Sequence, residues 1–268
     1  MTDWNVLRPE VEAVALRAGD ETLRYFRKSF TQWTKSSPYD VVTEADHASE
    51  AVILPALREL LPDAAVLSEE SGASGDIEGL RWVVDPIDGT TNFAAGLPYY
   101  SICIALVHGA GEPVIGVIYN PYFREMFSAS AGGGAYLNGD PIHVSETPSL
   151  ALSVLIGGFS IQPERAQRQL RQWSALMDRT RGLRRFGSAA LDLAYVASGR
   201  ADGFWEMFLK PWDVMAGLIL VQEAGGRISD FAGGVDRLYS GEEIVTTNGA
   251  LHDELLAVLA ATEDEGKL

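Results

Sequence analysis

The segment WVVDPIDGTTNF, residues 82–93, joins an apolar run to two carboxylates and a glycine turn. The apolar run is typical of a buried strand, which Asp85 ends, and Pro86 stiffens the exit from it. Gly89 permits a tight turn, so that Thr90 can begin a helix. Free N–H groups at a helix start bind phosphate, and paired carboxylates bind Mg²⁺. The segment therefore outlines a metal-dependent phosphoryl-transfer site.

The composition is that of a globular protein with a substantial core. The chain has 268 residues, of which 47% are hydrophobic, and its formal net charge is −16. This charge argues against a nucleic-acid binder, since affinity for the phosphate backbone comes from clustered Lys and Arg. No apolar run approaches the roughly 18 residues that span a bilayer, and no signal peptide is recognisable. Cys103 is the only cysteine, so no internal disulfide can form. We expect a cytoplasmic protein that acts on a small molecule, without nucleic-acid or membrane partners.

The first half of the sequence predicts two helices followed by strands. Apolar residues at helical spacing indicate a helix over 6–29. Thr43–Asp46 has the form of a capping box for a second helix, which ends at Pro62. The expected strands lie at 65–67, 80–84, 101–107, 114–119 and 125–129, with a loop over 71–79 and an antiparallel meander from 101 onward.

The second half alternates between strands and helices, which indicates α/β layering. Strands are expected near 152–156, 183–186 and 202–206, and helices near 164–178, 188–198 and 212–223. No internal repeat or flexible linker interrupts the chain. We therefore expect a single domain over 1–268, with one lobe at about 1–147 and another at about 148–268.

Further acidic and small residues stand at the ends of these predicted elements. Glu69-Glu70 follows a strand, Gly187–Ala190 precedes a helix, and Asp213 opens another helix. Taken alone, Asp85 and Asp88 could be simple turn formers. If the four carboxylates converge, they repel one another, and some protonate at neutral pH unless divalent cations compensate them. Zinc is not expected, because the four histidines are scattered and one cysteine cannot complete a ligand set.

Together these segments resemble the inositol monophosphatase family. Other segments match the family in order and spacing, namely Lys35–Pro38, Thr43–Asp46, Glu206-Met207 and Glu223–Gly226. The resemblance covers nearly the whole chain and implies an α/β, layered αβαβα sandwich of the inositol monophosphatase and fructose-bisphosphatase type. It also implies a magnesium-dependent, lithium-inhibited phosphatase, usually a homodimer. Such an enzyme hydrolyses small phosphate monoesters, in this case myo-inositol monophosphate.

The resemblance further implies which residues bind metal. The ligands fall on Glu69, Asp85, the Ile87 carbonyl, Asp88 and Asp213, for two or three Mg²⁺ in each active site. A first metal, held by Glu69, Asp85 and the Ile87 carbonyl, would activate the attacking water, which Thr90 helps to orient. The three aspartates would hold a second metal near the leaving-group oxygen. Glu69, Asp88 and Thr90 are accordingly the expected catalytic residues.

Substrate contacts also follow from the resemblance. The expected contacts are Ile87, Asp88, Gly89 and Thr90 for the phosphate, and Arg184, Ser188, Ala189, Glu206 and Asp213 for the alcohol. Glu206 can accept hydrogen bonds from two vicinal hydroxyls, which suits a polyol. Arg184 could instead form an ion pair at the surface or at a dimer interface. We expect three further residues to lie next to the metal ligands without binding metal themselves, namely Lys35, Asp46 and Glu70. Lys35 would offset negative charge there.

Other functions remain open at this point. Relatives within the superfamily act on fructose 1,6-bisphosphate, 3′-phosphoadenosine nucleotides or histidinol phosphate. Thr91-Asn92-Phe93 resembles the inositol monophosphatase version, whereas Lys210 leaves the substrate preference undecided. An aspartyl nucleophile is disfavoured, because it expects acids as DxD and two residues separate Asp85 from Asp88. A regulatory or binding protein on the same scaffold is the alternative from another class.

Overall fold

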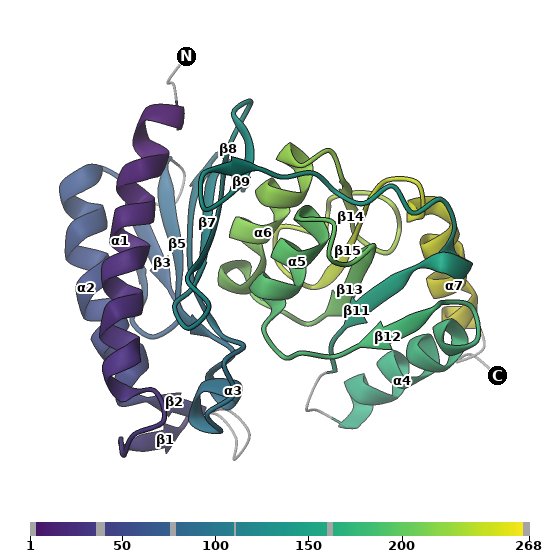
Figure 1. The fold of residues 1–268 in the computed structure, drawn as a ribbon, viewed down its shortest axis with the longest axis horizontal. Helices are drawn as coiled ribbons and strands as arrows, with labels where there is room; N and C mark the ends of the chain where they lie inside the picture. Colours follow the sequence, from purple (N-terminus) through teal and green to yellow (C-terminus); the bar gives the residue numbers. More distant parts are fainter. Residues whose placement is uncertain (1–3, 36–40, 76–78, 110, 160–162, 265–268) are drawn as a thin grey trace.

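Two sheets and three helical layers alternate through the molecule (Figure 1). The computed structural model describes residues 4–35, 41–75, 79–109, 111–159 and 163–264. From one side to the other, the layers are a helix pair, an eight-stranded sheet, a second helix pair, a five-stranded sheet and a third helix pair. This αβαβα order agrees with the fold class predicted from the sequence.

The eight-stranded sheet has the order β10-β9-β8-β7-β6-β5-β3-β4. Its strands are β3 (Ala65–Ser68), β4 (Gly72–Ser74), β5 (Arg81–Asp88), β6 (Ser101–His108), β7 (Glu112–Asn120), β8 (Glu125–Ser130), β9 (Gly134–Leu137) and β10 (Asp140–Pro141). Strands β6 to β8 form the predicted antiparallel meander, and β5 on one side and β9 and β10 on the other continue it. By contrast, β3 runs parallel to β5. Helices α1 (Trp4–Tyr25) and α2 (Glu44–Leu60) cover its outer face, and the hairpin of β1 (Gln32–Thr34) and β2 (Val41–Thr43) lies near their ends.

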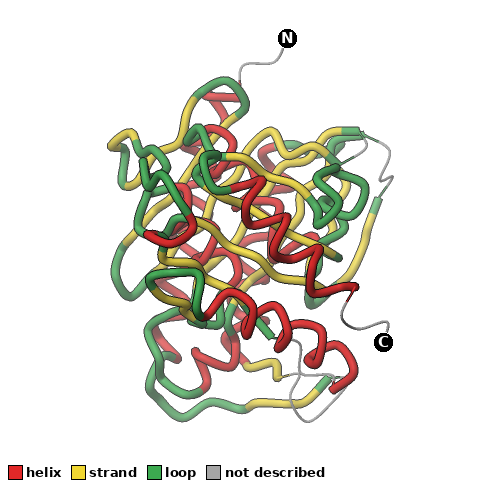
Figure 2. Tube along the Cα trace, turned by 90° about the vertical axis from the view of Figure 1, so that its right-hand side faces the viewer, coloured by secondary structure: helices red, strands yellow, loops and turns green. Residues whose placement is uncertain are grey.

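The five-stranded sheet has the order β12-β11-β13-β15-β14. Its strands are β11 (Val154–Gly157), β12 (Gly182–Arg184), β13 (Gly203–Met207), β14 (Arg227–Ser229) and β15 (Glu243–Thr247), preceded by the short 3-10 helix η1 (Leu150–Leu152). β11 is parallel to both neighbours, and β15 is antiparallel to both of its own. Helices α4 (Pro163–Met177) and α7 (His252–Asp264) lie on the outer face, toward the viewer in Figure 2.

Helices α5 (Ala189–Ala197) and α6 (Pro211–Glu223) form the central layer between the sheets. Small residues on the inner face of the first sheet let α6 approach closely. A Cβ added at Gly116 of β7 would lie 2.4 Å from the Ala216 carbonyl oxygen. On the other face of the sheet, larger side chains such as Trp82 and Ile104 pack under α1 and α2. The close approach of α6 brings its N-terminus beside the end of β5, where the short helix α3 (Thr90–Ala94) begins.

Three predicted elements differ from the structure. The helix predicted over 6–29 runs from Trp4 to Tyr25, because Arg27 takes a left-handed conformation with φ of 58° that an α-helix cannot continue. The strand predicted over 80–84 continues as β5 to Asp88 through an irregularity in its register. The loop predicted over 71–79 contains β4, which pairs antiparallel with β3. Among the described helices, none combines the length and apolar character that crossing a membrane requires.

Candidate active site

Three aspartates converge where β5 ends and α6 begins. Asp85 and Asp88 are buried and Asp213 is half-buried, and one carboxylate oxygen from each lies within 4.8 Å of the other two. Burial, followed by mutual repulsion, raises the pKa of Asp85 and of Asp213 well above the usual range. Burial also raises the pKa of Asp88 to about 6, against the hydrogen bonds it accepts. Such a cluster of all-oxygen donors matches the ligand preference of Mg²⁺.

The irregular end of β5 accounts for the convergence of Asp85 and Asp88. In a regular strand, residues three apart point to opposite faces of the sheet. The pairing of β5 with β6 shifts register between these two residues, which allows both carboxylates to serve one site. The Ile87 N–H donates to Asp85 Oδ1 at 2.9 Å, and the Ser49 hydroxyl donates to the Pro86 carbonyl at 2.9 Å. These bonds hold the irregular backbone in place.

Asp88 is anchored by residues at the start of α5. Its Oδ2 accepts hydrogen bonds from the Ser188 hydroxyl and, at 2.9 Å, from the Ala190 N–H at the start of α5. Nearby, Gly89 has a φ of 91°, and a Cβ there would lie 3.2 Å from the Gly187 carbonyl. The carboxamide of Asn92 donates to the Phe186 carbonyl at 2.8 Å. The glycine turn after β5 is therefore fitted against the loop before α5.

Asp213 takes part in the cap of α6 as well as in the cluster. Pro211 begins the helix, and the Lys210 N–H donates to Asp213 Oδ2 at 2.7 Å. Proline suits this first helical position because it has no N–H to leave unsatisfied. A carboxylate in the first turn is also favoured by the helix dipole. The local sequence around Asp213 thus fixes its backbone, and the packing of α6 on the sheet places its carboxylate beside β5.

The Thr90 hydroxyl is held by two acceptors. It donates to the Ile87 carbonyl at 3.0 Å and lies 3.2 Å from Asp46 Oδ1. The other Asp46 oxygen accepts from the Thr43 N–H at 2.7 Å and the Thr43 hydroxyl at 2.6 Å, which is the predicted capping box of α2. Burial raises the pKa of Asp46 to about 6, although these hydrogen bonds favour its charged form. The cap of α2 is thereby coupled to the position of Thr90.

Lys35 bridges the two glutamates that follow β3. Its Nζ lies 2.9 Å from Glu69 Oε1 and 2.6 Å from Glu70 Oε1. Burial opposes the charged ammonium, but hydrogen bonds to Glu70 and Glu69 outweigh it and raise the pKa of Lys35. Burial raises the pKa of Glu70 to about 7 despite this ion pair. Glu69 lies outside the cluster of three aspartates, yet its charge is the first cause after burial of the raised pKa of Asp85.

A polar cleft of about 180 Å³ opens beside the aspartates. Its lining consists of Asp88, Gly158, Arg185, Gly187, Ser188, Ala189, Asp192, Glu206, Leu209 and Asp213. Burial raises the pKa of Glu206 to about 8, while the nearby Arg185 opposes the shift. A Cβ at Gly158 would lie within about 2 Å of the Glu206 carboxylate. Only glycine at position 158 leaves room for Glu206 in this orientation.

The cleft includes five of the predicted site residues and two charged residues that the sequence reasoning missed. The predicted ones are Asp88, Ser188, Ala189, Glu206 and Asp213, and the missed ones are Arg185 and Asp192. Arg184 does not line the cleft, and its Nη1 instead donates to the Leu183 carbonyl at 3.0 Å. Asp192 lies one helical turn after Ser188, and this spacing was the available signal. The choice between Arg184 and Arg185 depended on how the chain leaves β12, which no local pattern reveals.

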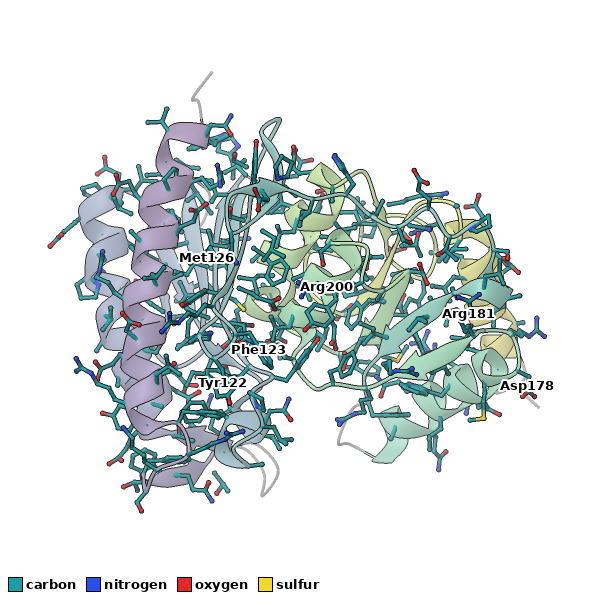
Figure 3. The ribbon with its side chains drawn as sticks, viewed as in Figure 1. Tyr122, Phe123, Met126, Asp178, Arg181 and Arg200 are labelled. Atoms are coloured by element: carbon teal, nitrogen blue, oxygen red, sulfur yellow. The ribbon has the colours of Figure 1, made fainter. Side chains whose placement is uncertain are left out.

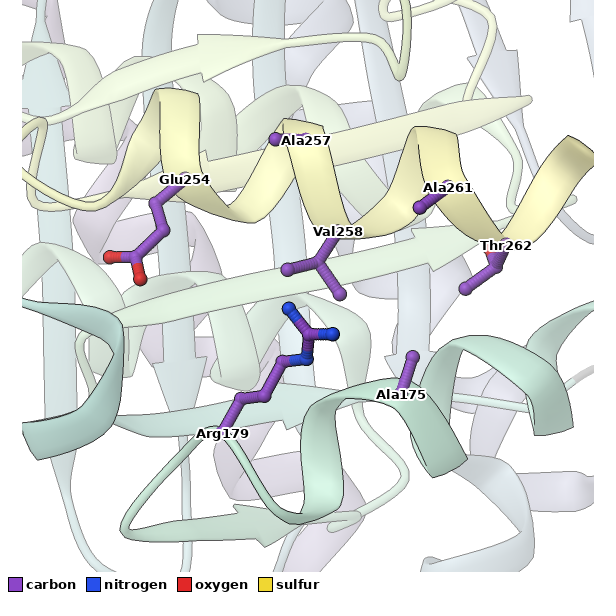
Figure 4. A pocket seen from close by; sticks show the side chains of 7 residues that line it. All are labelled: Ala175, Arg179, Glu254, Ala257, Val258, Ala261 and Thr262. Carbon is purple, nitrogen blue, oxygen red and sulfur yellow. The ribbon is translucent and has the colours of Figure 1, made fainter.

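A second hollow, of about 230 Å³, lies between α4 and α7 (Figure 4). Alanines and Val258 make up much of its lining, and Arg179 extends across it from the end of α4. Its one carboxylate, Glu254, accepts a hydrogen bond from the Leu150 N–H at 3.0 Å. This hollow has neither the clustered acids nor the glycine turns of the cleft, so we place the chemistry at the cleft.

Comparisons with known proteins found similar sequences and similar structures over nearly the whole chain. The family model described as the inositol monophosphatase family matches residues 4–264. The inositol-1-monophosphatase of Synechocystis sp. is 43% identical over 94% of this chain and 87% of its own length. The Nus factor SuhB of Pasteurella multocida is 40% identical over 94% of this chain and 96% of its own length. The solved inositol monophosphatase of Anabaena (Nostoc) sp. has a TM-score of 0.85 at 38% identity and covers 97% of both chains.

Proposed function

The chain belongs to the inositol monophosphatase family, and from this premise we propose that it hydrolyses myo-inositol monophosphate with Mg²⁺ as cofactor. Its membership makes it a phosphatase that acts on small phosphate monoesters. The observation that supports this substrate and this cofactor is that one cleft contains Glu206 beside Asp88 and Asp213. One end of this cleft suits a metal-bound phosphate, and the other suits an alcohol rich in hydroxyl groups.

The donor set fits magnesium. Asp85, Asp88 and Asp213 offer oxygen ligands within 4.8 Å of one another, and their raised pKa values reflect charge that a divalent cation would compensate. Glu69 and the Ile87 carbonyl would complete the ligands. Bound Mg²⁺ ions would lower the pKa of a water molecule and neutralise charge on the phosphate and on the leaving oxygen. We propose two or three ions for each site.

The protein's own groups would position the reactants. The Thr90 hydroxyl has one proton to donate, either to the Ile87 carbonyl or to Asp46, so its lone pairs remain available to accept a hydrogen bond from the attacking water. The backbone N–H groups of Gly89 and Thr90, at the start of α3, would bind phosphate oxygens. Ser188 and the Ala190 N–H hold Asp88 in place. This arrangement supports direct in-line attack by water without a covalent intermediate.

The alcohol half of the substrate would occupy the remainder of the cleft. Glu206 would accept hydrogen bonds from two vicinal hydroxyls, and Ser188 and Ala189 would contact the ring. An alcohol without those hydroxyls would leave a buried acceptor unpaired, which is costly. Arg184 is exposed and lies on the edge strand β12, so we keep it only as a candidate for an ion pair at the surface or between subunits.

The family resemblance supports three further proposals. The enzyme would be a homodimer, would be inhibited by Li⁺ through replacement of one Mg²⁺, and would act in the cytoplasm. The buried, unpaired Cys103 suits a reducing compartment. We also keep the proposal of one domain with lobes at about 1–147 and 148–268. The hydrogen bonds from Ser188 and Ala190 to Asp88 join those two lobes at the site.

The test is phosphate release from inositol 1-phosphate, fructose 1,6-bisphosphate, 3′-phosphoadenosine 5′-phosphate and histidinol phosphate. Each ester is measured with Mg²⁺, with EDTA, and with Mg²⁺ plus Li⁺. We expect turnover that is led by inositol 1-phosphate, abolished by EDTA and reduced by Li⁺. A large preference for another ester would contradict the substrate, and unchanged turnover in EDTA would contradict the cofactor.

A second role, as a binding protein, is favoured by the similarity to a relative named Nus factor SuhB. A pull-down with the Asp88→Asn variant would separate this role from catalysis. Partners retained by the variant at wild-type levels would support a separate binding role, and the absence of any specific partner would count against it.

A further inference from the structure

Asp192 is a buried acid of the cleft that lies outside the metal cluster. It belongs to the first turn of α5 and is 2% exposed, yet it lines the same cleft as Glu206 and Asp213. The three clustered aspartates do not include it. A carboxylate buried this deeply needs hydrogen-bond donors, because the loss of its hydration is otherwise uncompensated.

Tyr99 orients this carboxylate. Its hydroxyl donates to Asp192 Oδ1 at 2.8 Å. The ring of Tyr99 packs against Phe186 at a centroid distance of 4.9 Å and edge-on against Tyr195 at 5.5 Å. Its carbonyl accepts from the Asn92 carboxamide at 2.8 Å. Tyr99 is thus fixed on several sides, so Asp192 Oδ1 has a fixed partner while the residue also forms part of the cleft wall.

Charges around Asp192 show which groups share its part of the cleft. Burial raises the pKa of Asp192 well above the usual range, and the hydrogen bond from Tyr99 opposes the shift. Glu206 and Asp88 raise it further, whereas Arg185 lowers it. Arg185 also lowers the pKa of Glu206. Two carboxylates and one guanidinium therefore lie close to one another in the lining of this cleft.

We propose that Asp192 is a specificity-determining residue that, together with Glu206, accepts hydrogen bonds from the hydroxyl groups of the substrate's alcohol. Tyr99 acts through Asp192 as a positioning residue. The inference rests on the proposed function and names a further residue by which this site would select phosphate esters of polyols. Two acceptors in one cleft match an alcohol that presents hydroxyls on several neighbouring carbons, whereas an alcohol without them leaves acceptor positions on both acids unfilled.

A polyol fits this wall better than an amine does. Arg185 already supplies one positive charge close to both acids. A substrate ammonium group would compete with that guanidinium, whereas neutral hydroxyls can donate to the acids while Arg185 stays in place. The favoured ligand chemistry is therefore a set of neutral hydroxyl donors beside a phosphate ester.

The experiment compares Asp192→Asn with the wild-type enzyme on two esters in saturating Mg²⁺. Asparagine keeps the size of the side chain and an oxygen for the Tyr99 hydroxyl, but it removes the charge and one acceptor. For inositol 1-phosphate we expect kcat/KM to fall by roughly 10- to 100-fold. For ethyl phosphate, whose alcohol has no further hydroxyl, we expect a change of less than about twofold. Tyr99→Phe should reduce the preference for inositol 1-phosphate to a smaller degree.

The control variant is Asp178→Asn, because Asp178 is exposed just beyond the end of α4 (Figure 3) and does not line the cleft. It should behave like the wild type on both esters. Equal losses on both esters in Asp192→Asn would mean a structural role and would overturn the proposal, as would an unchanged preference. Histidinol phosphate is measured as a third ester, and a loss confined to it would overturn the proposal in favour of an amine-binding wall.

Two further measurements distinguish a misfolded variant, or a failure of the proposed function, from a failure of this proposal. Thermal unfolding of each variant shows whether it is folded, and Tyr99→Phe tests the same wall should Asp192→Asn fail to fold. If the wild type releases phosphate from no ester, the proposed function is wrong. Calorimetric titration of inositol 1-phosphate and ethyl phosphate then still tests Asp192, since only the binding of inositol 1-phosphate should weaken in the variant.

Discussion

Asp88 shows how much one carboxylate of this site depends on its neighbours. It lies at the end of β5, where burial disfavours its charged form. Two donors from the start of α5, the Ser188 hydroxyl and the Ala190 N–H, bind its Oδ2. Those bonds favour the ionised form that a metal requires and hold the side chain in one orientation. Asp213 has a comparable anchor in the Lys210 N–H.

We predict that Asp88→Asn or Asp213→Asn lowers kcat by at least about 10²-fold, or roughly 3 kcal/mol of transition-state stabilisation. Each amide keeps the shape of the acid but removes one negative ligand from the cluster. The measurement is kcat for inositol 1-phosphate at saturating Mg²⁺, with Asp178→Asn as the control. Near-wild-type turnover in either variant would remove that residue from the metal site.

At the scale of elements, the irregular end of β5 decides the arrangement of the site. A regular strand would have placed Asp85 and Asp88 on opposite faces of the sheet. The register shift opposite β6 permits the cluster that the structure contains. Pro86 is tolerated there because it lies between the paired residues, where no ladder hydrogen bond is lost.

A buried histidine joins three elements on the other side of the molecule. His252, at the start of α7, contacts Ser229 of β14 through Nε2 at 2.8 Å and Thr247 of β15 through Nδ1 at 3.1 Å. The Ser229 hydroxyl donates to the Asp230 carbonyl, so its oxygen accepts from Nε2–H. Nδ1 is then the acceptor for the Thr247 hydroxyl. The neutral imidazole satisfies both neighbours, and a second proton would break the bond to Thr247.

We predict that His252 makes the protein less stable in mild acid. Burial, assisted by Arg227, lowers its pKa to about 4, whereas an unfolded histidine has a pKa of about 6.5. The unfolded chain therefore binds the extra proton between these values, and stability falls as the pH drops through this window. The loss attributable to His252 should reach about 2 kcal/mol at pH 5 relative to pH 8.

Urea unfolding of the wild type and of His252→Gln at pH 8 and pH 5 measures this contribution. The variant should lose about 2 kcal/mol less than the wild type between the two pH values, whatever its stability at pH 8. His108→Gln, at an exposed position, should retain the wild-type dependence. Equal pH dependence in all three proteins would show that His252 does not titrate differently on unfolding.

Over the whole molecule, the proposed metal site lies where the eight-stranded sheet meets the central helical layer. Asp85 and Asp88 come from the eight-stranded sheet, and Asp213 comes from the central helical layer between the sheets. The acids raise one another's pKa values, so the folded protein without metal pays an electrostatic penalty once they ionise. A cation that removes this penalty stabilises the contact between β5 and α6 as well as the site.

We predict that Mg²⁺ stabilises the protein more strongly at high pH than at low pH. Asp88 has a folded pKa of about 6, above the unfolded value of about 3.9. Its contribution to the stability of the metal-free protein is therefore present in acid and is lost as the pH rises through about 6. The Mg²⁺-dependent increase in Tm should reach roughly 5 to 10 °C at pH 8 when Mg²⁺ is about 100 times its Kd.

The same increase should be much smaller at pH 5, where protons compete with the metal for the carboxylates. Differential scanning fluorimetry at both pH values, with Mg²⁺ and with EDTA, measures it. Asp213→Asn should show a reduced response to Mg²⁺ at pH 8. If Mg²⁺ raised Tm equally at both pH values and in the variant, the stabilisation would come from some other site.

The sequence by itself determined the family and the layered α/β fold, as well as the bounds of most elements within a few residues. These properties depend on local signals. The capping box at Thr43–Asp46 and the antiparallel runs after 101 are each encoded within a short segment. The family depends on the order of the motifs along the chain, because several matched segments in one order specify a family more strongly than any one of them.

Only the tertiary structure decided which side chains share the cleft. Arg185 lines it in place of Arg184, and Asp192 joins Glu206 there. The register shift of β5 likewise appears only when β6 pairs with it. Each of these features depends on contacts between segments remote in sequence, such as the 102 residues between Asp88 and Ala190. The physical reason is that spacing sets the direction of a side chain within its own element, whereas packing between elements decides what that side chain meets.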